Sequence, residues 1–148
     1  MIADKRKWIV VVLGTFAIGG CGEADRLSRE ELVREAAEIC GPLERELEAL
    51  PPPQSLSDLG TYAQRAGELT EDGLERLQEL RPPEALEQPF ERYLERVEQV
   101  VEQLDELEAA VAADDLDEAQ RLANEITGID DADDLARAAG IAAACERR

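Results

Sequence analysis

Residues 86–111, LEQPFERYLERVEQVVEQLDELEAAV, carry the most regular apolar pattern in the chain. Apolar side chains recur at alternating steps of four and three: Leu86, Phe90, Tyr93, Val97, Val100, Leu104, Leu107 and Val111. This spacing places them all on one face of an α-helix and is typical of a heptad seam. It predicts a long helix in a bundle, or a coiled coil with another chain. Pro89 is expected in or before the first turn, where a missing N–H costs least.

A helix is predicted before this segment, from Ser28 to the proline run at 51–53. Ser28 and Glu31 have the spacing of a capping box, in which each side chain bonds a backbone N–H of the other residue. Residues at steps of three and four form one stripe: Leu32, Ala36, Cys40, Leu43, Leu47 and Leu50. Because proline removes a helix hydrogen bond, we expect a bend at Gly41 and Pro42.

A second helix is predicted from about Ser55–Asp58 to about Leu80, followed by a break at 81–83. One side of it carries Leu59, Ala63, Ala66, Thr70, Gly73, Leu77 and Leu80. The small residues in its middle allow the backbone of a neighbouring helix to come close.

The segment after residue 115 has the pattern of a fourth helix that is interrupted. Its apolar positions are Leu116, Ala119, Leu122, Ala123, Ile126 and Ile129. Thr127, Gly128 and the acidic run at 130–134 weaken the periodicity before it resumes through Leu135 and Ala139. Gly140 is expected to stop the helix, with Ile141 folding back as its hydrophobic contact.

Four helices joined by short turns favour an all-α fold, an antiparallel up-down-up-down four-helix bundle over residues 28–148. No segment shows the alternation of a half-buried β-strand. This topology places the C-terminus beside the first helix, where Cys40 lies.

The first twenty residues have the pattern of a targeting segment. The basic residues 5–7 precede an apolar and glycine stretch from Trp8 to Gly20, which is shorter than the roughly 20 residues a membrane-spanning helix needs. It ends in Ile18, Gly19, Gly20 and Cys21.

This ending resembles the lipobox of bacterial lipoproteins, in which the cysteine receives a diacylglycerol and becomes the new N-terminus. The resemblance implies a signal peptide at 1–20, acyl chains such as palmitate on Cys21, and a tether at 21–27. The expected location is the extracytoplasmic face of the cell membrane. An ordinary signal peptide and an uncleaved membrane anchor are the alternatives. The layout of a lipobox, a helical domain, Cys40 in the first helix and an ending from Gly140 to Cys145 resembles the small lipoproteins of unknown function common in high-GC Gram-positive bacteria. This resemblance implies a fold and a location only.

The chain contains three cysteines, an odd number for an exported protein. If lipid modifies Cys21, then Cys40 and Cys145 remain as a pair in an oxidising compartment, where disulfides persist. We therefore predict a Cys40–Cys145 disulfide; two buried free thiols are the alternative.

The net charge of the chain is −19, and the chain contains no histidine. Removing residues 1–20 takes away three basic residues and Asp4, which leaves 13 basic and 34 acidic residues and a net charge of −21. Such a charge repels a nucleic-acid backbone, so no nucleic-acid partner is expected. Both lysines lie in the removed segment.

Catalysis is not indicated by the residues that remain. Histidine-based metal and haem sites are excluded, and the serines have neither histidine nor lysine as a partner. The run Asp130, Asp131, Asp133 and Asp134 lacks the glycine and glutamate of a calcium loop and is interpreted as a solvated acidic turn. No enzyme activity, cofactor or metal site is therefore predicted.

The preferred hypothesis is a lipid-anchored, non-catalytic envelope protein with a structural or interaction role. Its bundle would bind another envelope protein or itself. The alternative is a binding module for divalent cations or small cationic ligands, because of the acidic excess.

Overall fold

The computed structural model describes residues 26–127 and 131–145, and every regular element within these ranges is an α-helix. The all-α fold class predicted from the sequence is confirmed for this part of the chain. The helices are α1 (Arg29–Glu48), α2 (Leu56–Gln78), α3 (Glu84–Ala112), α4 (Leu116–Thr127), α5 (Asp131–Ala138) and α6 (Ala142–Cys145). The expected signal peptide at 1–20, Cys21, Gly128, Ile129 and Asp130 lie outside the described residues.

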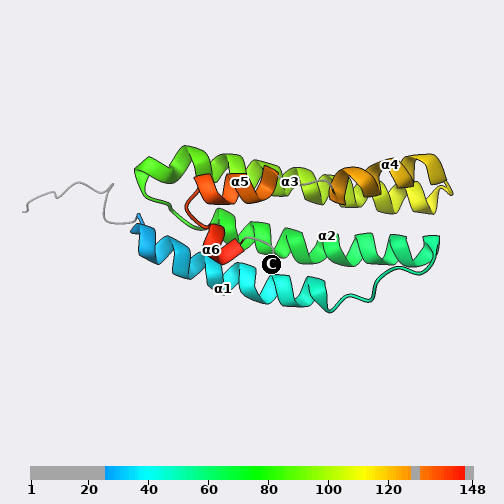
Figure 1. The fold of residues 1–148 in the computed structure, drawn as a ribbon, viewed down its shortest axis with the longest axis horizontal. Coiled ribbons are helices and arrows are strands. Elements are labelled where there is room, and N and C mark those ends of the chain that lie inside the picture. The colour runs from blue at the N-terminus through cyan, green and yellow to red at the C-terminus, as the bar shows by residue number, and fades with distance from the viewer. Residues whose placement is uncertain (1–25, 128–130, 146–148) are drawn as a thin grey trace, which may run out of the picture.

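The helices pack side by side in an elongated molecule (Figure 1). α2 lies between α1 and α3, and the contact between α2 and α3 is the most extensive one. α4 and α5 both pack on α3, toward opposite ends of the long axis, while α6 packs on α1 and α5. The predicted fourth helix, which was expected to stop at Gly140, corresponds to α4 and α5, and α6 is a further short helix after that stop.

The start of α1 is fixed by the predicted capping box. The Ser28 Oγ accepts a hydrogen bond from the Glu31 backbone N–H at 3.2 Å, and the Glu31 carboxylate accepts one from the Ser28 N–H at 2.8 Å. Two otherwise unpaired donors at the helix start are satisfied in this way. The hydrogen bond from the Ser28 backbone N–H and, to a lesser extent, the Ser28 side chain lower the pKa of the Glu31 carboxyl below its usual value.

The position expected for Pro89 was wrong. α3 begins at Glu84, with Pro83 as its N-cap, so Pro89 lies in the second turn of the helix. Its ring prevents the hydrogen bond that the Ala85 carbonyl would otherwise accept. Leu86 and Phe90, on either side of this turn, are both buried. Their packing stabilises the turn that proline weakens. This explains why the helix begins at Glu84, before Pro89.

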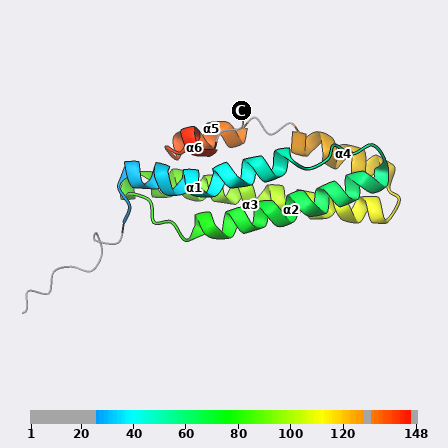
Figure 2. The ribbon, with the colours of Figure 1, turned by 90° about the horizontal axis from the view of Figure 1, so that it is seen from below.

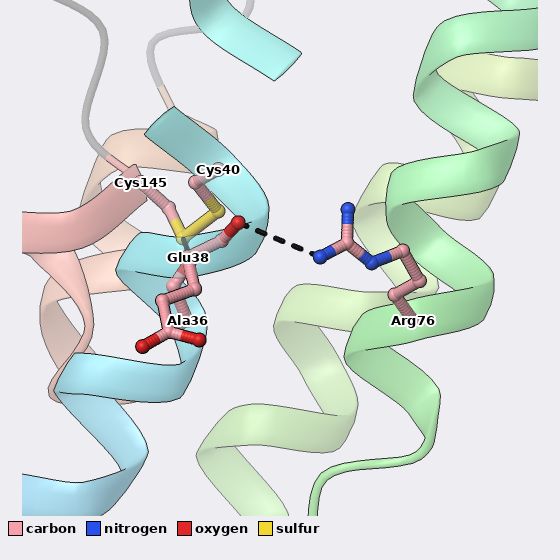
Figure 3. The surroundings of a disulfide bond; sticks show 5 residues. All are labelled: Ala36, Glu38, Cys40, Arg76 and Cys145. Carbon is pink, nitrogen blue, oxygen red and sulfur yellow. Dashed lines mark hydrogen bonds between the residues drawn. A yellow bond between two sulfur atoms is a disulfide. The ribbon is translucent and has the colours of Figure 1, made fainter. Parts of the chain in front are cut away.

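Pro42 does not end α1, which continues from Arg29 to Glu48 as one helix. Because proline has no N–H, the Glu38 carbonyl one turn earlier loses its helical donor. Arg76 of α2 reaches across, and its Nη2 donates a hydrogen bond of 3.5 Å to this oxygen (Figure 3). A neighbouring helix therefore satisfies the group that Pro42 leaves unpaired.

The core consists of two clusters of buried side chains. The first cluster joins α1, α2, α3 and the C-terminal segments: Leu32, Ala36, Ile39, Cys40, Leu77, Leu86, Phe90, Tyr93, Ala136, Ala139 and Ile141. The second cluster joins α2, α3 and α4: Ala63, Ala66, Leu104, Leu107, Ala110, Ala119 and Leu122. The seam of α3 contributes to both clusters, so its apolar face packs against helices of its own chain.

Candidate functional site

The two cysteines predicted to pair are joined in the structure. Cys40 lies in α1 and Cys145 in α6, with their Cα atoms 5.2 Å apart, and they form a disulfide (Figure 3). Cys40 is 7% exposed, whereas Cys145 is only half-buried. The bond joins residues that are 105 positions apart, so it closes nearly the whole described chain into a loop.

The backbone after α5 positions Cys145 for this bond. Gly140 has a φ of +77°, a conformation that residues with a side chain rarely adopt. Its N–H donates to the Arg137 carbonyl at 3.1 Å, and the Ile141 N–H donates to the Ala136 carbonyl at 2.9 Å. These are the two bonds of a Schellman motif, and the side chain of Ile141 is fully buried, as the sequence predicted.

The chain that enters α1 is bound to the turn between α2 and α3. The Leu27 N–H donates to the Arg81 carbonyl at 2.8 Å. Arg26 donates to the Pro82 carbonyl at 3.1 Å and forms an ion pair with both carboxylate oxygens of Glu87, at 3.1 and 3.3 Å. The sequence placed residues 26 and 27 in the tether, and these bonds attach both residues to the turn between α2 and α3. The contacts come from residues more than fifty positions away.

The described aspartates of the acidic run are used within the fold. Asp131 accepts two hydrogen bonds from the Arg96 Nε, at 3.0 and 3.2 Å, which joins the start of α5 to α3. Asp134 pairs with Arg137 one turn later at 2.5 Å. Nowhere in residues 26–127 and 131–145 do three or more histidine, cysteine, aspartate or glutamate side chains form a group able to hold a metal ion.

The phenol of Tyr93 is buried in the first core cluster, and Asp133 lies near it. Burial, and to a lesser extent the charge of Asp133, raises the pKa of Tyr93 to about 12. Both effects disfavour the charged phenolate, so Tyr93 stays neutral at physiological pH.

The surface has shallow hollows. One of about 290 Å³ lies beside the loop between α1 and α2, lined by Leu50, Pro51, Pro52, Gln54, Asp58, Thr61, Tyr62 and Arg65. Another of about 450 Å³ lies beside the bound N-terminal segment, where Arg26, Leu80, Arg81 and Glu87 contribute to its wall. Their lining residues include no cysteine and no histidine, so neither offers a thiol nucleophile or an imidazole base.

Among the described helices, none is both long enough and apolar enough to cross a membrane. A comparison of the chain with protein-family models, curated proteins and solved structures found no match.

Proposed function

We propose that this protein is a lipoprotein, held on the extracytoplasmic face of the cell membrane by acyl chains on Cys21, with a non-catalytic domain that has a structural or interaction role in the envelope. The observation that carries this proposal is the order of features in residues 1–21: basic residues, an apolar stretch, two small residues and a cysteine. Two or three acyl chains on one residue suffice for stable anchoring.

The cysteine count supports the same assignment. The chain has three cysteines, and Cys40 and Cys145 form a disulfide with each other. Cys21 is the one that remains, which agrees with a separate role as the lipid acceptor. Disulfides persist in exported proteins and are rare in the cytosol, so the pairing favours an extracytoplasmic location.

We infer that α1, α2, α3 and the α4–α5 segment follow one another in an up-down-up-down order. Each helix of this series packs on the next one along the chain, and short connections favour antiparallel neighbours. In this arrangement the α2–α3 turn lies beside the start of α1, in agreement with the bonds of Arg26 and Leu27 to that turn.

The short chain between Cys21 and Arg26 keeps the domain close to the lipid. Five extended residues span at most about 17 Å. Because Arg26 is bound to Pro82 and Glu87, this end of the domain stays within that distance of the acylated residue. The opposite end, with the α1–α2 loop and the α3–α4 turn, is free to meet a partner protein or a second copy.

The lipid anchor is tested with the full chain expressed in a bacterium that processes lipoproteins. Mass spectrometry of the mature N-terminal peptide should show acyl chains on Cys21, and Cys21→Ala should move the protein from the membrane fraction to the soluble one. Ala24→Ser, a control outside the lipobox, should stay in the membrane. A Cys21→Ala protein that is still cut and still sediments with membranes would refute the anchor.

The interaction role is tested by crosslinking in intact cells and recovery of the membrane-anchored protein. We expect crosslinks to one defined envelope protein, or to a second copy, through residues of the end away from Arg26. Recovery of the uncrosslinked monomer alone, at native expression levels, would contradict an interaction role and leave the anchor unaffected.

A further inference from the structure

The C-terminal helices α5 and α6 fill a space that the longer helices leave open. No Cα atom of α1 lies within 8 Å of a Cα atom of α3 in the described residues. α5 packs on α3, α6 packs on α1, and the two pack on each other, so they bridge this separation (Figure 2). The first core cluster therefore contains an apolar groove, with Leu32 and Ala36 on one wall and Phe90 and Tyr93 on the other, that residues 131–145 cover.

The segment 131–145 buries few large side chains completely, although Leu135, Ala144 and Cys145 also pack against the first core cluster. Its fully buried side chains are Ala136, Ala139 and Ile141, and two of these offer only a methyl group. The Arg96–Asp131 ion pair also joins the segment to α3, but the Asp131 side chain is 63% exposed, which weakens the pair. Burial stabilises in proportion to the apolar area that is removed from water. Small buried side chains therefore offset only part of the conformational entropy that is lost when fifteen residues become ordered.

The second core cluster is built without this segment. The second core cluster, which contains Leu104, Leu107 and Leu122, includes no residue after 126. The contact between α2 and α3 is also the most extensive one between helices of the described chain. Loss of the C-terminal segment therefore leaves one of the two cores complete.

We propose that residues 131–145 form a redox-releasable strap, held over the groove between α1 and α3 by the Cys40–Cys145 disulfide. A dithiol reductant attacks the Cys145 sulfur, which belongs to the more exposed of the two cysteines, and displaces Cys40 as a thiolate. The second thiol of the reductant then resolves the mixed disulfide. The protein gains two thiols, the dithiol becomes a disulfide, and α5 and α6 leave the groove while α1 to α4 stay folded.

The strap is tested by amide hydrogen exchange on the full-length, membrane-extracted protein, with and without dithiothreitol. Amides of 133–145 should exchange at least tenfold faster in the reduced protein, whereas those of 63–77 and 100–110 should change by less than twofold. Local opening of a weakly held segment gives this pattern, because exchange reports the stability of each region separately.

Two substitutions distinguish loss of the disulfide from any other effect of the reductant. Cys145→Ala should show the fast exchange of 133–145 without dithiothreitol, and Ala143→Ser, on the exposed side of α6, should behave as the wild type. Unchanged protection of 133–145 after reduction would overturn the proposal. Equal loss of protection in 100–110 would overturn it as well, since the disulfide would then hold the whole domain together.

Discussion

A close approach between α2 and α3 gives the sharpest test of the packing. Gly60 and Gly67 lie two turns apart in α2, and a side chain at either one would meet α3. A Cβ atom at Gly60 would lie 2.9 Å from Val111 Cγ1 and 3.4 Å from Val111 Cβ, which is a clash. A Cβ atom at Gly67 would lie 3.6 Å from Asp105 Oδ1 and 3.7 Å from Leu104 Cβ, which is ordinary contact.

The same substitution should therefore have opposite effects at the two positions. Glycine to alanine in a helix interior stabilises by about 1 kcal/mol. At Gly67 we expect a gain of roughly 0.5 to 1 kcal/mol. At Gly60 overpacking costs about 1 to 3 kcal/mol, and valine, which is stiff at χ1 in a helix, cannot rotate away. Gly60→Ala should thus destabilise the protein by roughly 1 kcal/mol. Its free energy of unfolding should be about 2 kcal/mol lower than that of Gly67→Ala.

Urea unfolding followed by circular dichroism at 222 nm measures both effects on the disulfide-bonded protein. The double variant Gly60→Ala with Val111→Ala removes the obstructing side chain. If the two changes were independent, the change in the free energy of unfolding of the double variant would equal the sum of the two single changes. We expect the double variant to be more stable than this sum by about 1 kcal/mol, the coupling typical of residues in contact. Equal stability of Gly60→Ala and Gly67→Ala, or strict additivity in the double variant, would refute the close approach of α2 to α3.

Three further predictions concern the described residues. The folded state keeps the Tyr93 proton up to a pH of about 12, whereas unfolded tyrosine loses it near pH 10. The raised pKa therefore contributes stability that is present below pH 10 and is lost as the pH rises to about 12. Urea titrations should show a loss of roughly 2 to 3 kcal/mol over this range, which Tyr93→Phe abolishes; a parallel loss in the variant would contradict it. Asp114 has a φ of 56° after α3, so Asp114→Gly should raise the free energy of unfolding by roughly 1 kcal/mol, whereas an unchanged midpoint would show no strain there. Calcium should raise the melting temperature no more than sodium chloride of equal ionic strength, since Asp131 and Asp134 are paired with arginines; a calcium-specific shift would instead support the cation-binding hypothesis.

The features that the sequence predicted correctly are those set by residues close together in the chain. The capping box of Ser28 and Glu31 spans four residues, and the stop at Gly140 followed by the burial of Ile141 spans two. The seam of α3 follows from local periodicity in the same way. Local hydrogen bonds and the helical repeat fix such features, so the sequence reveals them directly.

The features that the sequence did not predict depend on residues far apart in the chain. Arg76 bonds the carbonyl that Pro42 leaves without a donor, Arg96 binds Asp131, and Arg26 binds Glu87. Each arginine is also surrounded in the sequence by nearer acidic residues that would have been equally plausible partners. Only the packing of the helices selects one acceptor from among them.

By itself, the sequence determined that the described chain is helical, where most helices begin and end, and which face of each is apolar. The candidate functional residue Cys21 was also identified from sequence alone, and it stays a prediction. The tertiary structure decided which helices become neighbours: α1 and α3 are separated, and α5 and α6 cover the groove between them. The physical reason is that an apolar stripe specifies which side of a helix is buried, whereas the identity of the surface that buries it depends on how all the helices fit together.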